Sequence, residues 1–209
     1  MFSWLKPAIF AVCLIPLGQL AYRAYDGDLG ANPIDTVTRF TGSWALIFLL
    51  TSLAVTPLRR ISGWNELIKF RRMLGLYAFF YVLLHFSTFV GLDHFFDLNR
   101  IGKDIIKRPY VTAGFTAFLM MIPLALTSTA GMIRRLGKRW QHLHRLVYLA
   151  AIAAVIHFYW LVKSDITRPV QYGAVLAALL GYRIVVKWLQ PNPSRISRKP
   201  AVARSREAG

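Results

Sequence analysis

The chain has 209 residues, of which 56% are hydrophobic and 17% are charged. This composition is too apolar for a soluble domain of this length and indicates a polytopic membrane protein. The formal net charge of +17 does not indicate nucleic-acid binding, because strongly basic loops alternate along the chain with nearly neutral ones. The single cysteine, Cys13, excludes an intrachain disulfide or a cysteine-ligated cluster.

Six apolar segments are long enough to cross about 30 Å of hydrocarbon as helices. They lie near residues 7–23, 42–58, 74–92, 111–129, 146–162 and 170–188. Because backbone groups in lipid must be hydrogen-bonded within the protein, helices are expected and open strands are not. The sequence therefore predicts an all-α membrane protein, with a six-transmembrane-helix bundle over residues 1–189 and no visible internal repeat.

The sequence also makes a prediction for each end of the chain. The first segment follows Lys6 and has no clear cleavage site before Arg23, so we expect a retained helix and not a signal peptide. Residues 190–209 are rich in Pro, Ser and Arg and poor in apolar residues. This composition predicts a disordered, basic cytoplasmic tail.

The basic residues between the predicted spans are unevenly distributed, and their distribution orients the bundle. The loop between the second and third segments and the loop between the fourth and fifth are strongly basic, with Arg59, Arg60, Lys69, Arg71, Arg72, Arg134, Arg135, Lys138 and Arg139. The loops on the other side are nearly neutral. The positive-inside rule therefore predicts that both termini are cytoplasmic, and the basic residues are interpreted first as topology determinants that contact anionic lipid head groups.

Three histidines, His85, His144 and His157, lie in or at the end of predicted spans, where an imidazole is costly and is a candidate metal ligand or proton relay. The third and fifth helices run in the same direction, entering near Met73 and Arg145. His85 and His157 each lie about 18 Å beyond these points, at 1.5 Å per residue. Two imidazoles at equal depth can supply both axial positions of a haem iron.

His144 lies on the same predicted helix as His157 but about 20 Å closer to the cytoplasm. An ideal helix does not place the two on one face, so a local kink or two differently rotated haems are required. The third helix has Arg71 and Arg72 at the matching depth instead of a histidine. Three interpretations stay open: His142 is the missing ligand, His144 binds alone or shares duty with His157, or His144 is an interfacial residue. The haem count, one or two, stays open with them.

Three segments resemble a known family: RRMLGLYAFFYVLLH, GKRWQHLHRLVY and IHFYWLVKS. They are similar to the haem-binding membrane subunits of the periplasmic methionine-sulfoxide reductase system, the MsrQ or YedZ family, in the ferric-reductase-like transmembrane group alongside the NADPH oxidases. The resemblance implies a six-helix cytochrome b in the bacterial inner membrane, with haem b ligated by His85, His144 and His157, and with FMN as a further cofactor.

The same resemblance implies an electron-transfer subunit, not a catalytic one. Electrons would pass from the quinone pool or a cytoplasmic flavin reductase to a periplasmic molybdopterin-containing methionine-sulfoxide reductase, its partner in a heterodimer that repairs oxidised periplasmic proteins. The chain departs from the oxidases in having one histidine on the third helix where they have two. It also has no flavin or nicotinamide domain, so the donor is expected to be a separate molecule.

Further binding residues are expected at both membrane faces. On the cytoplasmic side, six basic residues cluster where an FMN phosphate or a quinone head group would approach: Arg71, Arg72, Arg134, Arg135, Lys138 and Arg139. On the outer side, the loop 93–110 holds Arg100, Lys103, Lys107 and Arg108, which are candidates for orienting haem propionates or the periplasmic partner. His94, in this loop, and His142 are interpreted as non-ligating.

Two alternative functions remain. A transmembrane ferric or other metal reductase would use the same haem with a small cation as acceptor. A non-haem proton-coupled transporter would use the histidines as a relay, but no predicted helix has an Asp or Glu in its interior, which counts against a relay.

Overall fold

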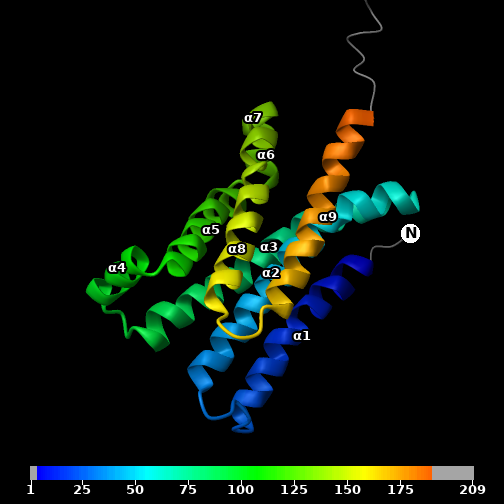
Figure 1. Ribbon diagram of the computed structural model, residues 1–209. Helices are drawn as coiled ribbons and strands as arrows, with labels where there is room; N and C mark the ends of the chain where they lie inside the picture. Colours follow the sequence, from blue (N-terminus) through cyan, green and yellow to red (C-terminus); the bar gives the residue numbers. More distant parts are fainter. Residues whose placement is uncertain (1–3, 190–209) are drawn as a thin grey trace, which may run out of the picture.

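The computed structural model describes residues 4–189, and these residues fold into helices joined by short loops (Figure 1). Six helical stretches among them are long and apolar enough to cross a membrane, which confirms the predicted all-α membrane bundle. Their main helices are α1 (Leu5–Tyr25), α2 (Pro33–Ser62), α3 (Ile68–Thr88), α5 (Pro109–Leu126), α8 (Leu146–Leu161) and α9 (Thr167–Leu189). The predicted tail, residues 190–209, lies outside the described residues.

Shorter helices fill the connections. A 3₁₀ turn, η1 (Asn65–Leu67), leads into α3, and a π-helical turn, η2 (Phe89–Asp93), follows it. An amphipathic helix, α4 (Leu98–Lys107), occupies most of the segment that the sequence left as an outer loop. The basic loop after α5 contains α6 (Ala130–Leu136) and α7 (Lys138–Leu143). We call the end of the bundle with α6 and α7 the basic end, and the opposite end, with α4, the outer end, because the loop charges predict that it faces outward.

The second predicted span was too short, because α2 begins at Pro33 and not near residue 42. The Asn32 side chain caps the helix by accepting a hydrogen bond from the Asp35 backbone N–H at 3.2 Å, and Pro33 suits the first helical position because it has no N–H to leave unpaired. The apolar pattern alone did not include these polar first turns, which extend α2 beyond the hydrocarbon at the outer end.

Two tyrosines of α3 hold α1 against the bundle. The Tyr81 hydroxyl donates to the Cys13 carbonyl at 3.0 Å and accepts from the Leu17 N–H at 3.1 Å, so it is inserted between two groups that an α-helix normally bonds to each other. The Tyr77 hydroxyl donates to the Phe10 carbonyl at 2.9 Å. Cys13 is buried in this contact, which makes it a packing residue.

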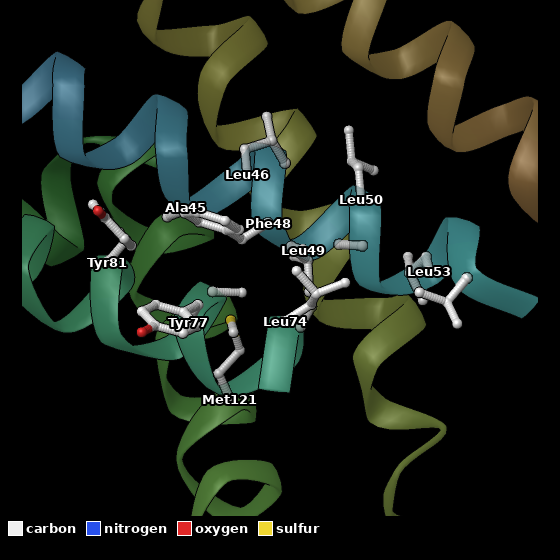
Figure 2. Close-up of a cluster of buried hydrophobic side chains, with 14 of the residues drawn as sticks. Ala45, Leu46, Phe48, Leu49, Leu50, Leu53, Leu74, Tyr77, Tyr81 and Met121 are labelled. Carbon is white, nitrogen blue, oxygen red and sulfur yellow. The ribbon is translucent and has the colours of Figure 1, made fainter. Parts of the chain in front are cut away.

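The apolar core lies mainly between α2 and α3, with Met121 contributed by α5 (Figure 2). Leu53, Ala78 and Tyr81 have no exposed surface. Burial of this kind contributes about 25 cal/mol per Å² of apolar surface in water, and in lipid the same close packing supplies dispersion contacts. The α2–α3 pair is therefore a rigid support for the side chains it carries.

The bundle contains two antiparallel helix pairs, α2 with α3 and α5 with α8, and contacts within each pair far outnumber contacts between them. In each pair the first helix runs from the outer end to the basic end, and the second returns. The chain thus repeats one hairpin plan, although its sequence shows no visible repeat.

Arg183 of α9 ties this helix to α2 through an unusual acceptor. Its guanidinium donates to the Leu53 carbonyl at 2.7 Å and to the Tyr148 hydroxyl at 3.1 Å. In an α-helix the Leu53 carbonyl would accept from the N–H of residue 57, but that residue is Pro57, which has no N–H. Arg183 therefore satisfies a buried carbonyl that the proline leaves free.

We expect Arg183→Met to lower the free energy of unfolding by about 1–3 kcal/mol, the cost of one unsatisfied buried polar group. Thermal unfolding in detergent measures the change. The double variant Arg183→Met/Pro57→Ala is the control, because alanine restores the N–H that the Leu53 carbonyl lacks. If Pro57→Ala recovers none of the loss, the explanation through Leu53 is wrong.

Candidate functional site

His85 of α3 and His157 of α8 face each other in the middle of the described bundle. Their ring centroids are 6.1 Å apart, and the ring planes are inclined at 76°. The equal depth expected from the sequence therefore corresponds to direct opposition of the two rings. They come from different hairpins, so the site exists only where the α2–α3 and α5–α8 pairs meet.

Each ring is oriented by a backbone carbonyl of the helix beside it. The Nδ1 atom of His85 lies 2.9 Å from the Thr38 carbonyl of α2, and the Nδ1 atom of His157 lies 2.6 Å from the Tyr110 carbonyl of α5. A carbonyl can only accept, so each Nδ1 carries the proton and donates it. Each Nε2 then keeps its lone pair, which is the state a metal-bound imidazole requires.

Each ring also lies directly against a glycine of that neighbouring helix. A Cβ atom added to Gly42 of α2 would be 3.0 Å from the His85 ring, and one added to Gly114 of α5 would be 2.7 Å from the Nδ1 of His157. Both positions have room for the imidazole only because the residue has no side chain.

The two rings line one cavity of about 670 Å³ between α2, α3, α5 and α8. This volume is within the usual range of about 300–1,000 Å³ for cofactor and ligand sites. Its deeper walls are apolar and aromatic and include Leu46, Leu49, Val82, Phe86, Phe115, Phe118, Met121, Ala154 and Phe158.

The outer end of the cavity is polar and charged. Arg39, Arg108 and Arg168 line it. Arg39 pairs with Asp35 at 2.7 Å, and Arg108 pairs with Asp104 at 3.3 Å.

Arg168 interacts electrostatically with Asp165, which also lines this end of the cavity. Hydrogen bonds from the side chain and backbone of Thr167 lower the pKa of the Asp165 carboxyl, and the charge of Arg168 lowers it further. The cavity is therefore apolar inside, with ionised groups at its rim.

This arrangement fits a haem. His85 and His157 would hold the iron of such a group, since metal–nitrogen bonds are about 2 Å long and the two ring centroids lie 6.1 Å apart. A porphyrin needs apolar walls for its faces, which the cavity supplies. Its carboxylate edge needs donors at a polar rim, and Arg39, Arg108 and Arg168 are there.

His144 is not part of this site. It follows α7 at a break in the helix, and α8 begins only at Leu146, so the helical stretch that holds His144 and His157 is interrupted between them, as one of the two alternatives from their spacing requires. The Nδ1 of His144 bonds to the Trp140 carbonyl at 3.2 Å, and its ring stacks on Trp140 with centroids 3.8 Å apart. Its Nε2 lies 3.5 Å from the Ser128 hydroxyl. Among the described residues, none of these contacts is a second histidine.

The two remaining histidines have partners of other kinds. His94 is buried, and its ring nitrogens lie 3.1 Å from the Phe89 carbonyl and 3.0 Å from the Asp104 carboxylate. It therefore ties η2 to α4. His142 is exposed, and its Nδ1 bonds to the Lys138 carbonyl of its own helix at 3.1 Å.

The six candidate residues for FMN or quinone all lie at the basic end. Arg71 and Arg72 are in the first turns of α3, and the others are in α6 and α7: Arg134, Arg135, Lys138 and Arg139. Arg71 is close enough to His144 for their charges to interact. Among the outer residues, Arg108 reaches the rim of the cavity, whereas Arg100 pairs with Asp97 at 3.1 Å.

The sequence reasoning missed Arg39, Arg168, Gly42 and Gly114 as parts of the site. The two arginines do not stand out in the sequence, because they lie in segments whose positive and negative charges nearly cancel. The glycines had one available signal, since Gly42 precedes His85 by the same number of residues as Gly114 precedes His157. This equal spacing gains a meaning only when α2–α3 and α5–α8 are known to be hairpins of the same plan.

Comparison with known proteins gives consistent results. Residues 41–155 match the family model of the ferric reductase like transmembrane component. A protein-methionine-sulfoxide reductase heme-binding subunit, MsrQ, of Herminiimonas arsenicoxydans is 52% identical over 187 residues, which cover 88% of this chain and 86% of that protein. The protein of the same name from Rhodospirillum rubrum is 52% identical over 85% of this chain and 86% of its own length.

A third protein of that name, from Azospira oryzae, is 50% identical over 204 residues, which cover 96% of this chain and 87% of the relative. The similarity therefore includes both hairpins and α9. No solved structure matches the chain.

Proposed function

Because the chain belongs to the MsrQ family of haem-binding subunits, within the ferric-reductase-like transmembrane proteins, we propose that it holds a haem b between His85 and His157 and transfers electrons across the bacterial inner membrane. The observation that carries this proposal is the pair of adjacent imidazoles that line one cavity, each with its Nδ1 hydrogen-bonded to a backbone carbonyl. The haem supplies one-electron redox chemistry when bound.

The protein contributes position, insulation and charge. The Thr38 and Tyr110 carbonyls accept hydrogen bonds from the Nδ1–H groups and so fix the tautomer and increase the basicity of each imidazole. The apolar walls exclude water from the iron position, and the guanidinium groups of Arg39, Arg108 and Arg168 would hold the propionates at the rim. The same walls would shield a bound haem from side reactions with water.

We propose that the outer end faces the periplasm, as the positive-inside rule predicts, so that the rim of the cavity meets the electron acceptor. The acceptor is a molybdopterin-containing methionine-sulfoxide reductase that forms a heterodimer with this subunit. In this arrangement the present chain carries electrons, and its partner reduces the methionine sulfoxide of oxidised periplasmic proteins.

At the basic end we place the entry of electrons, from a quinone or from a cytoplasmic flavin reductase. Six basic residues gather there, and within residues 4–189 none of them forms an ion pair with an acidic side chain: Arg71, Arg72, Arg134, Arg135, Lys138 and Arg139. Guanidinium and ammonium groups of this kind attract a phosphate or a quinone oxygen, and FMN is one ligand with the required phosphate.

The test uses the full-length protein reconstituted in liposomes with a quinol as reductant. The reduced-minus-oxidised spectrum is expected to show a b-type haem, and adding the oxidised periplasmic reductase with methionine sulfoxide is expected to re-oxidise it. Ferric citrate replaces the reductase in a parallel sample. Absence of a haem spectrum would exclude the proposal, and re-oxidation by ferric citrate alone would favour a metal reductase.

A further inference from the structure

The same contact between a histidine ring, a backbone carbonyl and a glycine occurs twice in the bundle, and each of the two hairpins contains one. His85 and the Thr38 carbonyl that accepts its proton are 47 positions apart, and His157 and the Tyr110 carbonyl are also 47 positions apart. In both cases the glycine that touches the ring lies one helical turn after the accepting carbonyl. The same register therefore occurs in two hairpins with different sequences.

The position of each glycine has a geometric reason. In an α-helix the carbonyl of one residue points toward the residue four positions later. A side chain at that later position would cover the carbonyl, whereas glycine leaves it open to a donor from a neighbouring helix. Gly42 thus exposes the Thr38 carbonyl to His85, and Gly114 exposes the Tyr110 carbonyl to His157.

The glycines also limit the rotation of the rings. Each imidazole is in contact with a helix backbone on its Nδ1 side, at distances that leave no space for a methyl group at Gly114 and almost none at Gly42. A hydrogen bond from Nδ1 and a backbone surface beside it together restrict the rotation of each ring. The observed result is that the two ring planes are inclined at 76°, close to perpendicular.

We propose that Gly42 and Gly114 are positioning residues that hold the two axial imidazoles nearly perpendicular and thereby set the electronic structure of the iron between them. This inference rests on the proposed function. Perpendicular rings direct their π orbitals at different iron d orbitals, so these orbitals remain close in energy. Low-spin ferric iron in that state gives a highly anisotropic electron paramagnetic resonance signal, whereas parallel rings separate the orbitals and give a more ordinary rhombic signal.

The experiment compares the ferric holoprotein with Gly114→Ala, Gly42→Ala and the control Gly181→Ala. Gly181 lies in the spanning helix α9 and has open space around it, so its variant adds the same methyl group without touching the site. For each protein, haem content, the paramagnetic resonance spectrum and the midpoint potential are measured.

The wild type and Gly181→Ala are expected to share one highly anisotropic low-spin signal. Gly42→Ala is expected to reduce its largest g value and shift the midpoint potential, because the His85 ring must move by a few tenths of an ångström. Gly114→Ala is expected to change both more strongly or to lose haem, because its contact is closer. We therefore expect a larger effect of Gly114→Ala than of Gly42→Ala on both the spectrum and the midpoint potential.

The proposal is overturned if Gly42→Ala binds haem with the wild-type signal and potential, or if the wild type gives the rhombic signal of parallel rings. Gly42→Ala tests the proposal even if Gly114→Ala fails to fold, because the His85 ring needs to move only slightly to make room for the methyl group at position 42. A wild-type protein without a low-spin haem would instead refute the proposed function, so the two failures are distinguishable.

Discussion

His157→Ala is expected to abolish the low-spin b-type spectrum of the purified protein and to lower haem affinity by at least about 100-fold. Loss of a partner that only orients a metal ligand already costs about 10–100-fold, and this substitution removes the ligand itself. It also leaves the Tyr110 carbonyl without its donor. His85→Ala is expected to give the same result, because the two imidazoles occupy equivalent places in the two hairpins. Haem content per chain and the reduced-minus-oxidised spectrum measure both variants.

His142→Ala and His144→Ala are the matched controls. Both remove an imidazole at the basic end, where the rings contact Lys138, Trp140 and Ser128 and not the central cavity. Each is expected to keep the low-spin signal of the central site. If His85→Ala or His157→Ala retained full haem with an unchanged spectrum, the axial pairing would be wrong.

Ala154→Phe is expected to prevent haem binding while leaving both histidines in place. Ala154 lies on α8 and lines the cavity beside His157, so a phenyl ring there would occupy the space of the porphyrin. Overfilling a packed site costs about 1–3 kcal/mol, and here the added ring competes directly with the cofactor. Haem content after expression with excess haem, together with thermal unfolding, measures the effect.

Ala178→Phe on α9 is the control for this substitution, because Ala178 is exposed and does not line the cavity. The control is expected to bind haem like the wild type. Full haem occupancy in Ala154→Phe would show that the cofactor is not in this cavity, even if the histidine variants lost it.

The sequence was sufficient for the fold class and for the pairing of two histidines. Hydropathy and length predicted six spans, and helix rise alone placed His85 and His157 at one depth, where the structure brings their rings together. These predictions succeed because depth in a membrane depends on one helix at a time. That the two rings ligate haem stays a prediction, tested by the variants above.

The missed features all depend on contacts between helices. Gly42 and Gly114 matter through rings that arrive from a different helix, and Arg183 matters through a carbonyl freed by Pro57 on α2. The break at His144 was recognised only as a requirement for a kink. Spacing within a single helix carries no information on contacts between helices, and a single sequence read without its relatives provides no other evidence for such contacts.

The division of the site between two hairpins has a consequence for how the protein is made. Each hairpin packs closely within itself, whereas the two touch each other sparsely around the cavity. If haem binds in this cavity as proposed, it would join two helical pairs that make few contacts with each other. Since a ligand that binds only the joined state stabilises that state by mass action, haem supply would control how much of the newly made chain survives proteolysis.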